Sequence, residues 1–152
     1  MITVKRESYA EVIDDIRPLL ERHWKEIARN QEKIPLDPDY SRYQALDAKG
    51  MLFIFTAKDE GEFVGYAIYF IGPHVHYKSH KWAISDIFWV KPERRGVMIG
   101  KRLFTLAEQT LKEAGASVMH TTSKIAHPEA SRLLVHLGHT LIEYGHAKLL
   151  LD

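Results

Sequence analysis

Cysteine is absent from this chain of 152 residues, so neither a disulfide framework nor a thiol nucleophile can contribute to its fold or chemistry. An excess of one charge is also lacking, because 21 Lys and Arg stand against 20 Asp and Glu, a formal net charge of +1. The basic residues are dispersed rather than gathered in one block. We therefore expect no nucleic acid partner.

Long apolar runs are missing as well, since no stretch approaches the ~18 residues of a membrane span. Lys5, Arg6 and Glu7 lie where a signal peptide needs an apolar run. These features predict no membrane association and a cytoplasmic location. The apolar content of 45% is enough for one compact core, so we expect a single domain over residues 1–152.

The first elements follow from spacing. Residues 2–6 alternate weakly as a strand, and Ser8 with Glu11 has the spacing of a capping box that opens a helix. Apolar residues then recur every three or four positions as far as Ile27, which predicts an amphipathic helix with one buried stripe. Pro18 is expected to kink or split this helix.

The remaining chain alternates helical and strand patterns. Predicted helices cover residues 40–48, 100–114 and 128–137, and predicted strands cover residues 51–57, 63–71, 82–90, 116–122 and 140–150. A histidine-rich stretch, residues 72–81, is expected to be a loop. Mixed helices and strands in this order predict an α/β (α+β) fold arranged as a three-layer sandwich.

The segment from Arg94 to Gly100 connects a predicted strand to a predicted helix. Free N–H groups of the first helical turn favour an anion there, and glycines at 96 and 100 allow close approach of the backbone. Nearby cations would add fixed positive charge: Arg94, Arg95, Lys101 and Arg102. The pattern indicates a phosphate or pyrophosphate site, although an ordinary strand-to-helix turn with solvated side chains is the alternative.

The residues from Val90 to Leu103, VKPERRGVMIGKRL, are similar to the acyl-CoA signature V-x-P-x-x-R-G-x-G-I-G-x-x-L of the GNAT superfamily of N-acyltransferases. The stretch from Ala130 to His139 also resembles the family's closing A-x-x-L-Y-x-x-x-G-F segment. The order of elements agrees over nearly the whole chain. This resemblance implies an α/β/α sandwich with a mixed, mostly antiparallel central sheet, and acetyl-CoA as acyl donor.

The resemblance also implies which residues hold acetyl-CoA. Main-chain groups of Phe88 and Val90 would pair with the pantetheine arm between the fourth and fifth strands, and N–H groups from Gly96 to Lys101 would hold the pyrophosphate. The implied set is Phe88, Val90, Arg95, Gly96, Val97, Met98, Ile99, Gly100 and Lys101. Among the departures from the family pattern, Met98 replaces the middle glycine and Leu134 replaces a tyrosine that often acts as an acid.

Acylation of an amine requires a base that removes a proton from the attacking nitrogen. Asp86 is the candidate, because it shares strand parity with Phe88 and Val90 and would face the thioester. A carboxylate that merely binds the amine, or one at a strand end, is the alternative. Tyr144 is a candidate acid, and a core tyrosine with its hydroxyl at the rim is the other interpretation.

Candidate acceptor-binding residues come from two segments. His74, His76 and Tyr77 lie just before the strand of Asp86 and are expected to rim the acceptor cleft. A solvated loop is the alternative, and no metal is expected because neither a cysteine nor a nearby carboxylate completes a ligand set. His23 and Glu26, near the end of the first helix, form the second group, with a solvated helix carboxylate as the alternative for Glu26.

These observations predict an N-acetyltransferase in which a primary amine attacks acetyl-CoA directly in a ternary complex, since the chain has no thiol and no other obvious nucleophile. The acceptor would be a small molecule or a peptide or protein amine. A homodimer is compatible with the family resemblance. The alternative function, suggested by Met98 and Leu134, is a non-catalytic acyl-CoA-binding or partner-binding module on the same fold.

Overall fold

The computed structural model describes residues 1–151, with the backbone alone for Val97. Its strands are β1 (Ile2–Glu7), β2 (Leu52–Asp59), β3 (Glu62–His74), β4 (Tyr77–Val90) and β5 (Ala116–His120). Its helices are α1 (Tyr9–Ile27), α2 (Tyr40–Ala48), the short 3-10 helix η1 (Pro92–Arg94), α3 (Val97–Glu113) and α4 (Pro128–His136).

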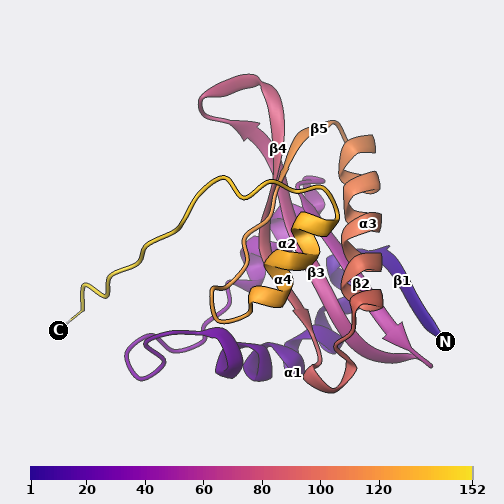
Figure 1. Ribbon diagram of the computed structural model, residues 1–152, viewed down its shortest axis with the longest axis vertical. Helices are drawn as coiled ribbons and strands as arrows, with labels where there is room; N and C mark the ends of the chain where they lie inside the picture. The colour runs from indigo at the N-terminus through magenta and orange to yellow at the C-terminus, as the bar shows by residue number, and fades with distance from the viewer. Residues whose placement is uncertain (152) are drawn as a thin grey trace.

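One sheet with the strand order β1-β2-β3-β4-β5 forms the middle layer (Figure 1). The first four strands pair antiparallel, and β5 pairs parallel to β4 because α3 carries the chain back across the sheet. Helices α3 and α4 lie on one face, and α1 and α2 lie on the other. The predicted three-layer sandwich with a mixed, mostly antiparallel sheet is confirmed.

Each face of the sheet has its own apolar core, because side chains alternate between the faces along each strand. On the α3 side, Phe55 and Tyr69 pack against Leu103 and its neighbours. On the α1 side, Ile54 and Ile68 pack against the helix stripe. The strands β2 and β3 are buried on both faces, which explains why they read as nearly continuous apolar runs.

Helix α1 begins as the sequence predicts. The Ser8 N–H donates to Glu11 Oε2 at 2.7 Å, and the Ser8 hydroxyl donates to the same oxygen at 2.8 Å. The helix does not split at Pro18, however, and runs unbroken to Ile27. Packing of the apolar stripe on the sheet supports the helix on both sides of the proline, so the helix is not split there, which was one of the two predicted effects of Pro18.

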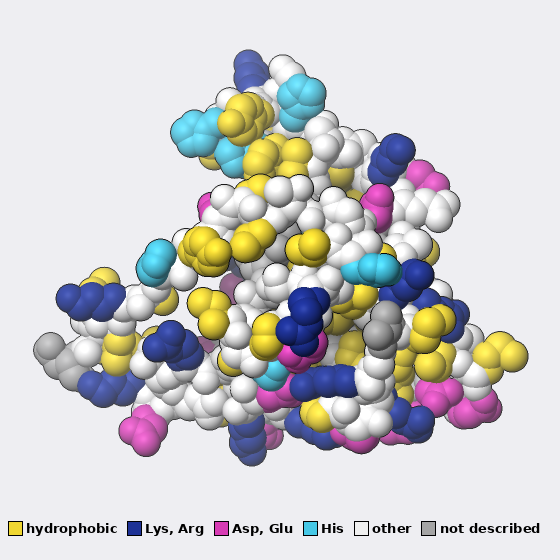
Figure 2. All heavy atoms as spheres, in the orientation of Figure 1, with side chains coloured by type: hydrophobic (Ala, Val, Ile, Leu, Met, Phe, Trp, Pro, Cys, Tyr) yellow, Lys and Arg dark blue, Asp and Glu magenta, His cyan; other side chains and the backbone are white. Residues whose placement is uncertain are grey.

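The histidine-rich stretch 72–81 is not a loop. Strand β3 continues to His74 and β4 begins at Tyr77, so this stretch forms the tip of a long hairpin that projects beyond the helices (Figure 1). Ring contacts hold it, with the centroids of His74 and Trp82 4.4 Å apart and Tyr77 stacked on Trp82. In Figure 2, histidine and apolar side chains gather at this projecting tip.

The predicted strand over residues 140–150 was also wrong, because this segment is extended but contains no strand in the described chain. It leaves the end of α4 and runs away from the body of the molecule (Figure 1). A strand requires a hydrogen-bonded neighbour, and β5 is paired only with β4. Apolar side chains on this segment are therefore exposed: Leu141, Ile142, Tyr144, Leu150 and Leu151.

Within residues 1–151, no helix is long and apolar enough to cross a membrane.

Candidate functional site

The turn between β4 and α3 is open around Gly96. This residue is the N-cap of α3, where it has no side chain to cap the first turn, and a Cβ placed there would meet nothing within 4 Å. The N–H groups of the first turn have no partner within the helix and point toward this open end. Backbone N–H groups in such a place can bind a phosphate, and the phosphate site stays a prediction.

The cations around this turn are mostly engaged by the protein itself. Arg94 donates to Asp59 Oδ2 at 3.0 Å, Arg95 is paired with Glu26, and Arg102 donates to the carbonyl of Ile2 at 2.8 Å. These guanidinium groups hold the loop in place and are not free to bind a ligand. An anion at this turn would therefore be bound mainly by backbone N–H groups and by the exposed Lys101, and less by the arginine side chains.

Gly100, Met98 and Ile99, in the first turn of α3, have different surroundings. A Cβ at Gly100 would lie 2.8 Å from Leu133 Cδ2 of α4, so this glycine allows α3 and α4 to pack closely and does not face a ligand. Met98 replaces the family's middle glycine, and 63% of its surface is exposed. Its side chain is therefore not packed into the first turn of α3. Ile99 is buried in the core beneath the turn.

Strands β4 and β5 separate beside this turn. Their ladder ends at the pair Ile84 and His120, whereas β4 continues to Val90. Beyond that point the β5-facing edge of β4 has backbone groups without a partner strand among the described residues. The Val90 carbonyl accepts a hydrogen bond from Arg95 Nε at 3.0 Å, and the Phe88 ring packs on Phe104. The gap is suited to an extended chain with amide groups, such as pantetheine.

Asp86 lies on the opposite face from the one that its strand parity predicts. Ile87 pairs with Ile68 and Ser85 pairs with Tyr69, so Asp86 is the extra residue of a β-bulge in β4. The bulge turns the carboxylate toward α2, where Asp86 Oδ2 accepts a hydrogen bond from the Tyr43 hydroxyl. The parity argument was therefore wrong, although the bulge does place Asp86 at the point where β4 and β5 separate.

The surroundings of Asp86 make its carboxylate a stronger base than a carboxylate in water. Burial raises the pKa of Asp86, and the hydrogen bond from Tyr43 offsets only part of this rise. Burial also raises the pKa of the Tyr43 hydroxyl, so it stays protonated and acts as a donor. A carboxylate with a raised pKa is a better proton acceptor than one in water.

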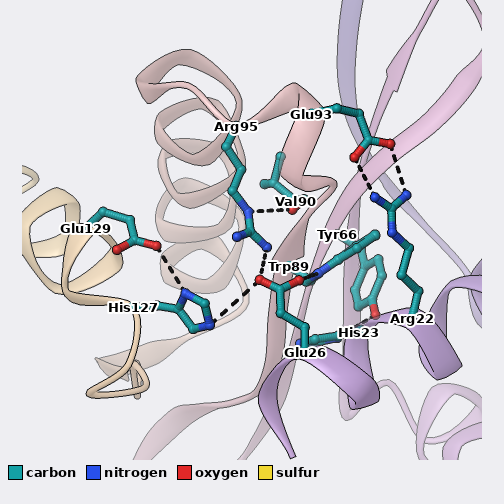
Figure 3. Close-up of polar contacts among 10 residues, drawn as sticks. All are labelled: Arg22, His23, Glu26, Tyr66, Trp89, Val90, Glu93, Arg95, His127 and Glu129. Atoms are coloured by element: carbon teal, nitrogen blue, oxygen red, sulfur yellow. Dashed lines mark hydrogen bonds and ion pairs between the residues drawn. The ribbon is translucent and has the colours of Figure 1, made fainter.

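Glu26 joins three parts of the chain, as Figure 3 shows. One carboxylate oxygen accepts from Trp89 Nε1 of β4 at 2.9 Å, and the other is paired with Arg95 and lies 3.7 Å from His127 Nε2. Burial alone would raise the pKa of Glu26, but the bonds from Trp89 and Arg95 lower it overall. Both oxygens of Glu26 are therefore engaged by the protein, and this position does not agree with the predicted binding of an ammonium group.

His23 is buried beneath this brace, with 3% of its surface exposed. Its Nδ1 lies 2.7 Å from the Tyr66 hydroxyl, and its ring is stacked on Trp89. Burial lowers the pKa of His23 to about 4, so the ring is neutral near pH 7. The expected role in acceptor binding does not agree with this position, because a core histidine cannot contact a substrate from solvent.

The expected acceptor residues of the hairpin tip lie far from Asp86. Tyr77 pairs with His74 at the tip, and Asp86 lies nine positions further along β4, roughly 30 Å at about 3.3 Å per position. His74, His76 and Tyr77 therefore cannot rim a cleft that holds an amine at Asp86. Residues 1–151 contain no group of three histidine or carboxylate side chains placed to hold a metal ion.

Tyr144 lies on the extended C-terminal segment, and 73% of its surface is exposed. The neighbouring Glu143 lies 3.1 Å from His120 Nε2, so this part of the segment crosses the end of β5. The predicted strand that would hold the Tyr144 hydroxyl at the site is missing. Leu134, where the family often has a tyrosine, is buried in the protein and offers no proton.

Two important contacts were missed from the sequence. The bond from Tyr43 to Asp86 joins residues 43 positions apart, so no local pattern indicates it. Trp89 was assigned to a strand without any role, yet its indole N–H fixes Glu26. The only available signal for Tyr43 was its place on a short helix beside the apolar stripe, and that does not identify its partner.

Comparison with known proteins agrees with this geometry. The model of the family described as "Acetyltransferase (GNAT) family" matches residues 13–138. Among curated proteins, no sequence matches significantly. A ribosomal-protein-alanine N-acetyltransferase from Brucella melitensis biovar Abortus 2308 has a similar structure, with a TM-score of 0.72, 14% identity and 100% of both chains covered.

Two further solved structures are similar over nearly their whole length. An aminoglycoside acetyltransferase from an uncultured soil metagenomic sample, in complex with sisomicin, has a TM-score of 0.76 and 17% identity, covering 99% of this chain and 97% of that one. A predicted acetyltransferase with acetyl-CoA from Clostridium acetobutylicum has a TM-score of 0.75 and 14% identity, with the same coverage. At these identities the likeness shows the fold.

Proposed function

Because the chain belongs to the GNAT acetyltransferase family, we propose that it transfers an acetyl group from acetyl-CoA to a primary amine by direct attack in a ternary complex. The observation that carries this proposal is the position of Asp86. The β-bulge places its carboxylate beside the gap between β4 and β5, on the face covered by α1 and α2. A cytoplasmic location is part of the proposal.

Acetyl-CoA would bind with its pyrophosphate on the N–H groups that follow Gly96 and its pantetheine along the free edge of β4. The open N-cap supports the first part, because phosphate oxygens can reach the backbone there. The end of the β4–β5 ladder at Ile84 supports the second part. Phe88 and Val90 supply main-chain groups beside that gap, with the Val90 carbonyl already held by Arg95.

The proposed reaction needs one base. Asp86 takes a proton from the amine, directly or through water, and the nitrogen forms a bond to the thioester carbonyl carbon. The carbon–sulfur bond then breaks, and the CoA thiolate leaves with the electron pair and is protonated from solvent. A thiolate is a good leaving group, so the buried Leu134 and the exposed Tyr144 do not prevent the reaction.

The acceptor class can be a small amine or a peptide or protein amine. Among the similar structures, one is a ribosomal-protein-alanine acetyltransferase and another is an aminoglycoside acetyltransferase. Both names refer to acceptors with a free amine. We therefore propose an amine acceptor for this chain as well.

Two measurements test the proposal. Calorimetric titration with acetyl-CoA should give a dissociation constant on the order of micromolar, about −8 kcal/mol. Addition of primary amines should then release CoA, detected with a thiol reagent, which the protein itself cannot react with because it contains no cysteine. Binding without CoA release from any amine would favour the non-catalytic module suggested by Met98 and Leu134.

We also propose that the exposed C-terminal segment pairs two copies of the chain. Strand β5 lies at the edge of the sheet, and Leu141 and Ile142 are exposed on the nearby extended segment. Burial of these side chains against a second copy would remove apolar surface from water. Light scattering should give a dimer mass for the wild type and a monomer mass for the Leu141→Glu, Ile142→Glu double variant.

A further inference from the structure

A cavity of about 350 Å³ lies on the face of the sheet that α1 and α2 cover, between α1, the segment 34–38 and α2. One wall is the apolar stripe of α1, which includes Val12, Ile13 and Ile16. The opposite wall is formed by Ile34, Pro35 and Leu36, which pass over the stripe without filling the space beneath.

The floor of the cavity is a row of three isoleucines on adjacent strands. Ile54 of β2 pairs with Ile68 of β3, and Ile68 pairs with Ile87 of β4, so the three side chains lie side by side across the sheet. They point to the same face because paired residues share an orientation. The floor therefore leads from the middle of the sheet to β4.

The end of this row meets the proposed base. Ile87 directly follows Asp86 in β4, and Tyr43, which also lines the cavity, donates its hydroxyl hydrogen to Asp86. A ligand in the cavity would thus have its apolar part over the isoleucines and one end beside Tyr43 and Asp86. An ammonium or amine group is the natural partner for that end, because a half-buried carboxylate favours a positive or hydrogen-bonding group.

The lining excludes highly polar acceptors. Asp37 is the only charged residue among the described residues that line the cavity, and it lies on the exposed segment 34–38. A polyamine or an aminoglycoside would bury several charged groups against isoleucine side chains without partners, which is costly. The volume is near the lower end of the range of about 300–1,000 Å³ found for small-molecule sites.

We propose that this cavity is the acceptor site and that it selects small primary amines with an apolar body, such as arylalkylamines or alkylamines. The proposal rests on the acetyltransferase function given above and narrows its acceptor. The apolar body occupies the space between the α1 stripe and the isoleucine row. The amine lies at Asp86, which removes its proton during transfer.

The first test compares acceptors. CoA release is measured with 2-phenylethylamine, spermidine, sisomicin and a short peptide with a free amino terminus. We expect kcat/KM for 2-phenylethylamine to be at least about tenfold higher than for the others, equivalent to the burial of one or two apolar groups. Release with spermidine, sisomicin or the peptide alone would leave the acetyltransferase function standing and overturn the inference.

The second test alters the cavity without changing the base. Leu36→Ser removes an apolar wall from a side chain that is 38% exposed, and Ile13→Trp fills the cavity with a larger ring. Each should raise KM for 2-phenylethylamine about fivefold or more, while the affinity for acetyl-CoA is unchanged. Val135→Ser, which changes an exposed apolar residue of α4 outside the cavity, is the matched control and should leave KM unaltered.

A binding measurement separates this inference from the proposed reaction. Titration of 2-phenylethylamine into the wild type with isoleucine methyl NMR should shift the signals of Ile54, Ile68 and Ile87, and Leu36→Ser should weaken the effect severalfold. Shifts without CoA release from any amine would remove the reaction and keep the binding site. Absence of shifts at these methyl groups would overturn the site, whatever the activity.

Discussion

The turn at Gly96 and the surroundings of Asp86 are built from different parts of the polypeptide. The turn depends on the backbone, because an open N-cap and the first N–H groups of α3 provide its binding capacity. The surroundings of Asp86 depend on side chains, since the Tyr43 hydroxyl of α2 donates to the carboxylate on β4. A backbone site suits a ligand that every family member shares, and a side-chain site can differ between members with different acceptors.

The same contrast appears in the charges. The arginines beside the turn are bound to the protein, with Arg94 on Asp59 and Arg95 on Glu26, so they hold the loop in place. On the amine side, Asp86 has a single protein donor, Tyr43, among the described residues. Its other carboxylate oxygen accepts no hydrogen bond from a side chain among the described residues.

Replacement of the proposed base should have the largest effect. Asp86→Asn keeps the size of the side chain and removes its capacity to accept a proton, so kcat should fall about 100-fold. The dissociation constant for acetyl-CoA should not change, because the turn at Gly96 is unaltered. In the wild type, kcat/KM should fall as the pH drops through the raised pKa of Asp86. Steady-state kinetics with unchanged turnover across pH would remove Asp86 from this role.

Loss of the brace should reduce stability. Glu26→Ala leaves the indole N–H of Trp89 and the guanidinium of Arg95 without their acceptor, which should cost about 2 kcal/mol in the free energy of unfolding. Glu129→Ala is the control, since Glu129 is exposed and contacts only His127 among these residues. Chemical denaturation should show that the control loses less than about 0.5 kcal/mol in the free energy of unfolding. Equal effects from both variants would contradict the bracing role.

The buried histidine predicts a pH effect on folding. The pKa of His23 is about 4 in the folded protein and 6.5 in the unfolded chain, so only the unfolded chain gains a proton as the pH falls between these values. The wild type should lose about 2 kcal/mol between pH 7 and pH 5 from this group. His23→Leu should lack that loss. An equal loss of stability between pH 7 and pH 5 in the two proteins would show that His23 is accessible when folded.

Removal of the hydroxyl beside the base should have a smaller effect on catalysis. Tyr43→Phe deletes the one hydrogen bond that lowers the pKa of Asp86, so that pKa should rise further. The acidic limb of the pH–rate profile should move to higher pH, and kcat at pH 7 should fall about threefold to tenfold. A lower kcat without movement of the limb would indicate that Tyr43 positions the substrate instead.

The turn itself should tolerate a change at its one unusual residue. Because Met98 is largely exposed, Met98→Gly should change the affinity for acetyl-CoA by no more than about threefold. The free energy of unfolding should fall by about 1 kcal/mol, since glycine is a poor helix former. Calorimetry that shows a tenfold gain in affinity would mean that the methionine obstructs the pyrophosphate after all.

The two sides also differ in how far the sequence predicts them. The turn was predicted, because its glycines, the preceding Val-x-Pro and the following helix are contiguous. Helix α2 was predicted with its observed bounds, Tyr40–Ala48, for the same reason. Contacts between distant segments were not predicted, since nothing local indicates that Tyr43 meets Asp86 or that Trp89 meets Glu26.

The errors also have physical causes. A β-bulge shifts the alternation of side chains by one residue, so the face of Asp86 cannot be read from the spacing to Phe88 and Val90. Apolar alternation over residues 140–150 indicates a segment capable of pairing, but pairing needs a free neighbour that the sequence does not specify. The hairpin tip was taken for a loop because histidine and proline hide the strand pattern that tertiary pairing imposes.

Mass spectrometry of the acceptor follows the acetyl group itself. The protein is incubated with acetyl-CoA labelled with 13C in the acetyl group and with 2-phenylethylamine, and the amine is then analysed. We expect an N-acetylated amine that carries the label, in an amount equal to the CoA released, and about 100-fold less of it with Asp86→Asn. Release of CoA with unlabelled amine, or equal product from both proteins, would contradict it.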